Sequence, residues 1–296
     1  DKETDAVTSN PALIAEICAT ELEQLSSKPL AGKTGDYFPT HQPSMGPWAA
    51  ADAPDRMPQL ATSAPKANRG SLLSRIQDYG LFQECLHRAA HHKAAGWDKF
   101  PNELLQALPE PLQRGMHHMF VVMWITSHTP TSWKVSDTIL LYKKGDPLDA
   151  SNYRPIGLAT TTYKLYTNMI MHALSSYAEQ HGMLSTSQEG FRKGKNTLRQ
   201  LNTVINALED AAHSRQNIYL MYIDFSSAFN TVDHDKLLRI MWELGFPQGA
   251  VEAVKNLYTG AQTRIKTRHA ISRPILLERG DRKSTRLNSS HLVISY

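Results

Sequence analysis

Hydrophobic residues recur every three or four positions along much of the chain after residue 70, which is the spacing of one face of a helix. This spacing predicts two helices within residues 71–108, flanking a turn at Gly96, and single helices over 111–128, 161–182, 196–214, 234–245 and 249–260. Continuous apolar runs and extended pieces interrupt the helical pattern and predict strands over 136–144, 152–159, 218–225 and 263–269.

Residues 1–70 show neither helical nor strand periodicity over most of their length. They hold eight of the 16 prolines of the chain, and a long proline-rich stretch of this kind is expected to form a mostly disordered linker. One short stretch differs, because apolar side chains fall roughly on one face after an Asn-Pro start. It predicts a single short helix over residues 10–25.

Composition excludes several classes of protein. The 296 residues are 41% hydrophobic and 20% charged, which is ordinary for a globular chain. The two cysteines, Cys18 and Cys85, are too few and too far apart for a disulfide framework or a CxxC site. No apolar run has the length of about 18 residues that a membrane span needs. We therefore expect an intracellular protein without a membrane partner, and the missing initiator Met suggests a fragment.

The stretch LMYIDFSSAFNTVDHDKLL, residues 220–238, carries the most informative carboxylate of the chain. Asp224 stands where the apolar run 218–223 ends. Taken alone, an aspartate in this place is more often a helix N-cap than a functional group. However, Phe229 follows about one helical turn later, and the intervening backbone amides turn toward the same side. That arrangement suits a site for a metal-bound phosphate and its sugar.

Three segments decide between these interpretations. Residues 133–170 (WKVSDTILLYKKGDPLDASNYRPIGLATTTYKLYTNMI), 187–201 (SQEGFRKGKNTLRQL) and 222–238 (YIDFSSAFNTVDHDKLL) follow one another in the order and at the spacings of the reverse transcriptase domain. The chain resembles the reverse transcriptases of retrotransposons that lack long terminal repeats. The likeness covers roughly residues 71–279, and before Trp133 it rests on KAAGWDKFPNELL.

The resemblance implies an α+β fold. Residues 71–132 become a helical lead-in, and residues 133–280 become part of the fingers and palm of a right-hand polymerase, in which helices back an antiparallel palm sheet. It also implies a cofactor, Mg²⁺ or Mn²⁺, because this class of nucleotidyl transfer uses two divalent ions.

The roles of the residues around Asp224 also follow from the resemblance. Asp224 matches the first catalytic aspartate and metal ligand, and the backbone carbonyl of Phe225 would complete the coordination of one ion. Phe229 matches the steric gate, whose ring excludes a ribose 2′-hydroxyl. Ser226 and Ala228 lie between them and join Phe225 and Phe229 in the nucleotide-binding segment.

Two further groups of basic residues match the family. Lys143 and Arg154 correspond to residues that close on the incoming triphosphate, and Lys144 is an alternative to Lys143. A solvated charged hairpin is the other interpretation, but Arg154 stands inside the apolar stretch YRPI, where an unpaired Arg is costly, and this favours the functional role. The glycine-containing loop GFRKGK matches a template-binding segment and supplies three candidate contacts to template phosphates, Arg192, Lys193 and Lys195. A basic loop is more often just solvated, so that role depends on the resemblance.

Some positions depart from the family. Asn230 stands where Asp is common and Trp97 where Pro is common, but neither is expected to bind metal. The histidine pairs His91-His92 and His117-His118 suggest zinc, yet no cysteine lies nearby, so they are expected to be surface or packing residues.

The last sixteen residues differ in character from the rest. The codons of a widely used sequencing adaptor translate to residues 281–291 and, after two index codons, to residues 294–296, so residues 281–296 are expected to be an adaptor-derived artefact. This tail supplies +2 of the formal net charge of +4. Local charge is more informative, because residues 133–200 hold nine Lys or Arg against five Asp or Glu.

The sequence therefore predicts a fragment of an RNA-directed DNA polymerase. Its expected partners are an RNA template, a DNA primer and deoxynucleoside triphosphates, and the nucleus is the compartment that fits target-primed retrotransposition. No Asp-Asp dipeptide occurs in the chain, so the fragment itself is expected to be inactive. The alternative is a noncatalytic or domesticated nucleic-acid-binding protein derived from such an element.

Overall fold

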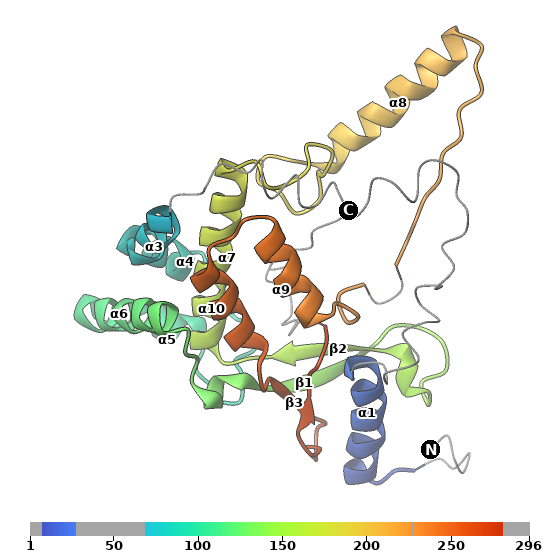
Figure 1. Ribbon diagram of the computed structural model, residues 1–296. Coiled ribbons are helices and arrows are strands. Elements are labelled where there is room, and N and C mark those ends of the chain that lie inside the picture. The colour runs from blue at the N-terminus through green and yellow to red at the C-terminus, as the bar shows by residue number, and fades with distance from the viewer. Residues whose placement is uncertain (1–7, 28–68, 226–227, 281–296) are drawn as a thin grey trace.

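The computed structural model describes residues 8–27, 69–225 and 228–280, and Figure 1 shows their arrangement. Ser226 and the predicted adaptor tail 281–296 lie outside the described residues. The helices are α1 (Pro11–Ser26), α3 (Arg69–Gln77), α4 (Tyr79–His87), α5 (Asn102–Gln106), α6 (Glu110–Thr126), α7 (Thr161–Gln180), α8 (Thr197–His213), α9 (His234–Glu243) and α10 (Gln248–Tyr258). The strands are β1 (Val135–Tyr142), β2 (Tyr153–Leu158), β3 (Gln262–Ile265) and β4 (Ile275–Leu276), with short 3₁₀ turns η1 (Thr131–Lys134) and η2 (Ala150–Asn152).

The mixed α+β class predicted from the sequence is confirmed, but the sheet is not purely antiparallel. Its strand order is β2-β1-β3-β4, and β1 pairs antiparallel with β2 but parallel with β3. The hairpin between β1 and β2 returns the chain directly, which favours the antiparallel pair. Between β1 and β3 the chain passes through α7 to α10, and a long helical connection of this kind allows a strand to return in the same direction.

The N-terminal part of the domain has three helices where the sequence predicts two. Asp78 separates α3 from α4, because its side chain accepts the backbone N–H of Gly80 at 2.8 Å and so caps α4. The same carboxylate also bonds Arg75 at 2.9 Å. The third helix, α5, begins after Pro101, beyond the turn that contains Gly96.

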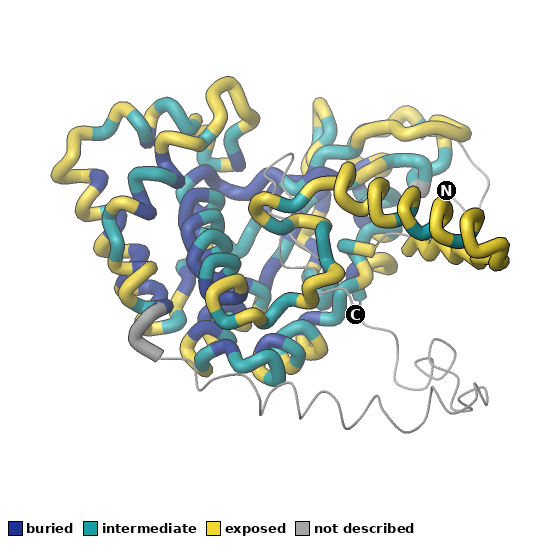
Figure 2. Tube along the Cα trace, turned by 90° about the horizontal axis from the view of Figure 1, so that it is seen from above, coloured by how far each residue is buried: buried dark blue, intermediate teal, exposed yellow. Residues whose placement is uncertain are grey.

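The main hydrophobic core forms around α7 (Figures 1 and 2). Tyr166 is 2% exposed and lies against Phe120, with 5.1 Å between the ring centroids. Trp133 meets the same two rings at 6.2 and 6.4 Å. Aromatic side chains from α6, η1 and α7 therefore fix the position of α7, and burying such large rings is among the strongest contributions to a core.

The segment that contains Gly96 is clamped over the first turn of α7. A Cβ atom at Gly96 would lie 2.6 Å from the backbone carbonyl of Ala159, so only glycine fits without movement of the chain. The hydroxyl of Thr161 donates to the backbone carbonyl of Phe100, and Lys164 donates to the carbonyl of Ala94 at 3.1 Å. These contacts join the helical lead-in to the β2–α7 junction.

Helix α1 packs on strands β3 and β4, and Figure 1 shows it beside the sheet. Ala19 is fully buried against Ile265 and Ile275. Arg273 pairs with Glu23 at 2.5 Å, and the carbonyl of Ser26 accepts backbone N–H groups from residues 278 and 279. A helix predicted from the sequence without a role thus covers one face of β3 and β4. Within the described residues, no helix is both long and apolar enough to span a membrane.

We predict that Gly96→Ala lowers the free energy of unfolding by about 1–3 kcal/mol, because the added methyl group overlaps the backbone of Ala159. Gly115→Ala is the matched control. Gly115 lies within α6, and the space that a Cβ atom would take there is open, so alanine should stabilise by about 0.5–1 kcal/mol. Urea unfolding of the two variants measures both effects. Equal stability of the two variants would contradict the clamp.

Candidate nucleotide and nucleic-acid site

The predicted strand over residues 218–225 is not formed. These residues have no regular structure and lie in solvent, with Tyr219 90% and Tyr222 83% exposed. A strand buried on both faces needs hydrogen-bonding neighbours and apolar layers above and below it. In the described residues, α8 extends away from the body instead of covering this segment (Figure 1), and the sheet ends at β2 and β4. The prediction failed because the apolar run has no neighbouring strand to pair with.

Asp224 is exposed in this segment. It does not cap the helix that follows, because α9 begins at His234 and its N-cap is Asp233, whose side chain accepts the N–H of Lys236 at 3.0 Å. The capping interpretation of Asp224 is therefore wrong. No group of three His, Cys, Asp or Glu residues that could hold a metal ion is found in the described part of the chain. Asp224 and the exposed Phe225 do not, by themselves, fit a pair of divalent ions.

Phe229 lies against the basic loop that the sequence places in template binding. Its ring meets that of Phe191 edge-on, with 6.2 Å between centroids and 75° between planes. Phe191 has a φ of 61°, which is a rare backbone conformation for a bulky residue. Sequence reasoning missed Phe191, and its place directly after Gly190 was the available signal. Ala228 is exposed, and its carbonyl accepts the hydroxyl of Thr231 at 3.3 Å.

Lys143 and Arg154 lie at the open end of the β1–β2 hairpin. Arg154 pairs in register with Leu141, and the backbone N–H of Lys143 bonds the carbonyl of Asn152 at 2.9 Å. Gly145 turns the chain with a φ of 99°. Both cations are exposed, and neither makes an ion pair with another described residue. Lys144 is exposed as well.

Arg192 differs from the other two predicted template contacts. Its guanidinium binds both carboxylate oxygens of Glu179, at 2.8 Å each, and donates to the carbonyls of Ser185 and Gln188. The side chain is only 11% exposed. The hydrogen bond from Arg192 lowers the pKa of Glu179 below its ordinary value. Arg192 thus fixes the loop to the end of α7, and its charge is already matched.

Lys195 also has an internal partner, since its ammonium group lies 3.0 Å from a carboxylate oxygen of Glu189. Lys193 is exposed and makes no ion pair with any residue the structure describes. Of the three predicted cations of this loop, Lys193 is therefore the one available to a nucleic-acid phosphate.

Helix α8 follows the basic loop and has no buried residue, and Figure 2 draws its tube in the colours of exposed and intermediate residues. Its apolar side chains fall on one face and remain in solvent, with Leu198 and Leu201 the most exposed of them. Thus no buried side chain holds the helix, or the apolar run that follows it, against the other described elements.

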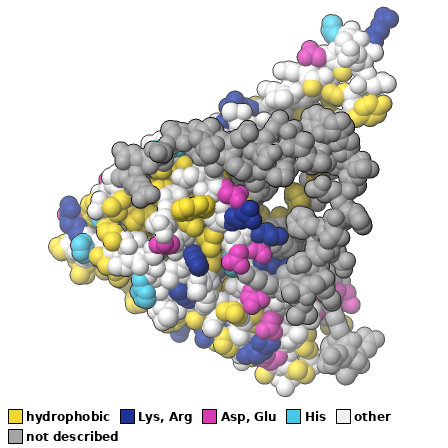
Figure 3. Space-filling view, viewed as in Figure 1, with side chains coloured by type: hydrophobic (Ala, Val, Ile, Leu, Met, Phe, Trp, Pro, Cys, Tyr) yellow, Lys and Arg dark blue, Asp and Glu magenta, His cyan; other side chains and the backbone are white. Residues whose placement is uncertain are grey.

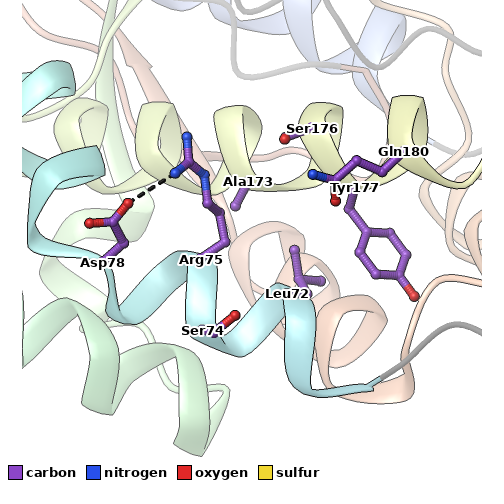
Figure 4. A pocket seen from close by; sticks show the side chains of 8 residues that line it. All are labelled: Leu72, Ser74, Arg75, Asp78, Ala173, Ser176, Tyr177 and Gln180. Atoms are coloured by element: carbon purple, nitrogen blue, oxygen red, sulfur yellow. Dashed lines mark hydrogen bonds and ion pairs between the residues drawn. The ribbon is translucent and has the colours of Figure 1, made fainter.

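A cavity of about 450 Å³ lies elsewhere, between α3 and α7 (Figure 4). Leu72 and Tyr177 line its apolar part, and Arg75 and Asp78 face each other at 2.9 Å across its polar part. None of the predicted site residues lines it. It is therefore separate from the nucleotide site that the sequence predicts.

Comparison with known proteins finds one matching region, and it contains Lys143, Arg154, the basic loop and the segment before α9. Residues 142–277 match the family described as reverse transcriptase (RNA-dependent DNA polymerase). This region is therefore similar to the reverse transcriptase domain, and relatives of the chain are named as RNA-directed DNA polymerases of mobile elements.

The relatives are proteins of mobile elements. The chain is 28% identical over 191 residues to the probable RNA-directed DNA polymerase from transposon X-element of Drosophila melanogaster, and 25% identical over 189 residues to that from transposon BS of the same species. Each match covers 64% of this chain and 21% of the relative. A further match, 25% identical, is the retrovirus-related Pol polyprotein from type-1 retrotransposable element R2 of Popillia japonica, covering 48% of this chain and 19% of the relative. The chain thus spans about one fifth of these proteins.

We predict that Arg192→Gln and Glu179→Gln each raise backbone hydrogen exchange over residues 185–195 by about tenfold, because each breaks the charged pair that holds the loop. The double variant should add little to either single change. Since the folded pKa of Glu179 is lowered, the stabilisation is complete above the ordinary pKa of Glu and is lost as pH falls through the lowered value.

Lys193→Gln is the control for this experiment, because it changes the charge of the same loop without breaking an ion pair among the described residues. Its exchange should match that of the unaltered chain. If Lys193→Gln loosened the loop as much as Arg192→Gln, the structural role of Arg192 would have to be abandoned.

Proposed function

We propose that residues 142–277 provide nucleotide and template contacts of an RNA-directed DNA polymerase that copies RNA into DNA in a retrotransposon. The observation that carries this proposal is the β1–β2 hairpin, which presents Lys143 and Arg154 as exposed cations. Neither cation makes an ion pair with another described residue, and both lie in the region that matches the reverse transcriptase family. In the proposal this hairpin belongs to the fingers, and β3, β4, α9 and α10 belong to the palm.

The proposed substrates are an RNA template, a DNA primer and deoxynucleoside triphosphates. Lys143 supplies a point charge and Arg154 a planar pair of donors, a combination suited to the oxygens of a triphosphate. Phe225, Ser226 and Ala228 contribute to the nucleotide-binding segment. Lys193 contacts a template phosphate, whereas Arg192 and Lys195 support the loop through their carboxylate partners.

Phe229 is the proposed steric gate. Its edge-on contact with Phe191 supports this role, because a second ring can hold the gate in one orientation. A gate selects by overlap with the 2′-hydroxyl, so its position must be fixed more closely than that of an ordinary apolar contact.

Mg²⁺ or Mn²⁺ is the proposed cofactor of the whole enzyme, with Asp224 and the carbonyl of Phe225 among the ligands. Two ions about 3.5–4 Å apart need more carboxylates than Asp224 alone can supply. The described residues contain no such group, and the sequence contains no Asp-Asp dipeptide. DNA synthesis is therefore proposed for an enzyme in which further carboxylates join Asp224.

The first test uses the 296-residue chain itself. We predict no primer extension on a primed RNA template with Mg²⁺ or Mn²⁺, because a single exposed aspartate cannot hold both ions. The same preparation should still bind the primed template, as measured by fluorescence anisotropy. Metal-dependent extension that Asp224→Asn abolishes would show that the ions are held without further carboxylates, and this part of the proposal would be wrong.

The second test uses an enzyme completed from the extended genomic locus. Replacing Phe229 with Val should raise ribonucleotide incorporation far more than it lowers deoxynucleotide incorporation, since the space for a 2′-hydroxyl opens. The measurement is the ratio of the two kcat/KM values on one primed template. Loss of both activities together, with a lower Tm, would mean that Phe229 only packs against Phe191, because truncating a core Phe costs about 3–5 kcal/mol.

A noncatalytic nucleic-acid-binding protein derived from such an element is the second candidate. The isolated position of Asp224 among the described residues favours it. Binding of primed template by the completed locus product, with no extension under any metal condition, is the outcome that would select this candidate.

A further inference from the structure

Strand β3 has two different faces. Ala261, Thr263 and Ile265 are buried, and Ile265 contacts the α1 side of the sheet. The alternate residues Gln262, Arg264 and Lys266 face the opposite side, because successive side chains of a strand point to opposite faces. Since α1 covers the first face, the basic side chains of β3 are confined to the second.

A buried carboxylate orients these basic side chains. Asp137 of β1 is directly opposite Arg264 in the parallel register and accepts two hydrogen bonds from its guanidinium, at 2.6 and 3.1 Å. Lys266 lies 3.5 Å from the other carboxylate oxygen. Asp137 is 3% exposed, whereas Arg264 is 30% and Lys266 43% exposed. One buried negative charge therefore holds two cations whose outer surfaces reach solvent.

Arg268 is a third cation, two residues beyond Lys266 and outside the strand. It lies at the exposed tip of a tight turn that Thr267 and Ala270 close by mutual hydrogen bonds. It makes no ion pair with any described residue. Arg264 and Lys266 thus stand at alternate positions, about 6.6 Å apart along an extended chain, and Arg268 follows at the tip of the turn. We call these three residues the β3 basic row.

The β3 basic row lies on the same sheet face as Arg154. Arg154 pairs with Leu141 on β1, and Leu141 shares its face with Asp137, four residues earlier on the same strand. β1 lies between β2 and β3, so Arg154 and the β3 basic row flank one strand. Across β1 the two outer strands are about 10 Å apart, and along β1 the partner of Arg154 lies four residues, about 13 Å, from the partner of Arg264.

We propose that the β3 basic row binds successive phosphates of the nucleic-acid strand that this domain uses, beside the nucleotide held at Arg154. This inference rests on the proposed function. After Asp137 is counted, the row carries a net charge of +2. It holds no aromatic side chain on which a base could stack, so binding should depend on phosphates and not on base sequence.

The positive charge that binds phosphates in this proposal belongs to the β3 basic row and not to the molecule as a whole. Figure 3 shows Lys and Arg side chains interleaved with Asp and Glu on the face that it displays, and the formal net charge of the chain is only +4. Nonspecific attraction by the whole molecule is therefore weak, and loss of two cations from one row should be distinguishable from loss of two cations elsewhere.

The experiment measures binding of a fluorescent RNA–DNA primer–template hybrid to the full 296-residue chain over a range of salt concentrations. The variant Lys266→Ala/Arg268→Ala should weaken binding about tenfold or more at low salt and reduce the slope of log K against log salt by about two. The control Arg88→Ala/Lys93→Ala removes the same charge from exposed positions after α4 and should change neither quantity appreciably.

Further variants separate the possible causes. Arg268→Ala alone does not touch Asp137, so it should keep the Tm of the unaltered chain and lower the slope by about one. Equal losses of binding affinity in the row variant and the control would overturn the proposed role of the β3 basic row. If Lys193→Ala weakened binding while the row variants did not, the proposed function would stand and the row would be rejected. Absence of any binding by the unaltered chain would overturn both.

Discussion

The parallel pairing of β1 with β3 is the constraint on which the arrangement of the domain depends. It joins residues 127 positions apart, and the pair Asp137–Arg264 lies at its centre. A slip of one residue would place Asp137 opposite Thr263 or Ile265 and turn Arg264 toward α1. A buried carboxylate without its guanidinium is costly, so this ion pair selects the register. The β1–β2 hairpin, α10 and α1 are then held in place by the same sheet.

Local patterns were enough to predict most helices and the β1–β2 hairpin. The long apolar face of α7 and the Gly-Asp turn after Lys144 are properties of neighbouring residues, and both appear where the sequence puts them. The parallel pair β1–β3 could not be predicted this way, since it depends on where the chain returns after four helices. The run 218–225 failed for the same reason, because its pattern describes a buried strand and not the neighbours that would bury it.

The candidate site shows the same division between residue type and partner. Arg192, Lys193 and Lys195 are equivalent in the sequence, yet Glu179 and Glu189 neutralise two of them. Both glutamates precede the loop, and their spacing in the sequence does not predict which cation each one binds. Conversely, Arg264 and Lys266 lie in a segment whose sequence is typical of an ordinary strand, and both pair with the buried Asp137. Which cations remain available to a ligand is decided by tertiary contacts with carboxylates distant in sequence.

The packing of α1 has a consequence for synthesis of the chain. Its partners Ile265 and Ile275 are about 250 residues further on, so at roughly 5–20 residues per second the ribosome needs about 12–50 s to produce them after α1 emerges. A 16-residue helix is only marginally stable alone in water. During that interval α1 has no sheet to cover, and its docking must be among the last steps of folding. The helix that comes first in the sequence therefore completes the sheet last.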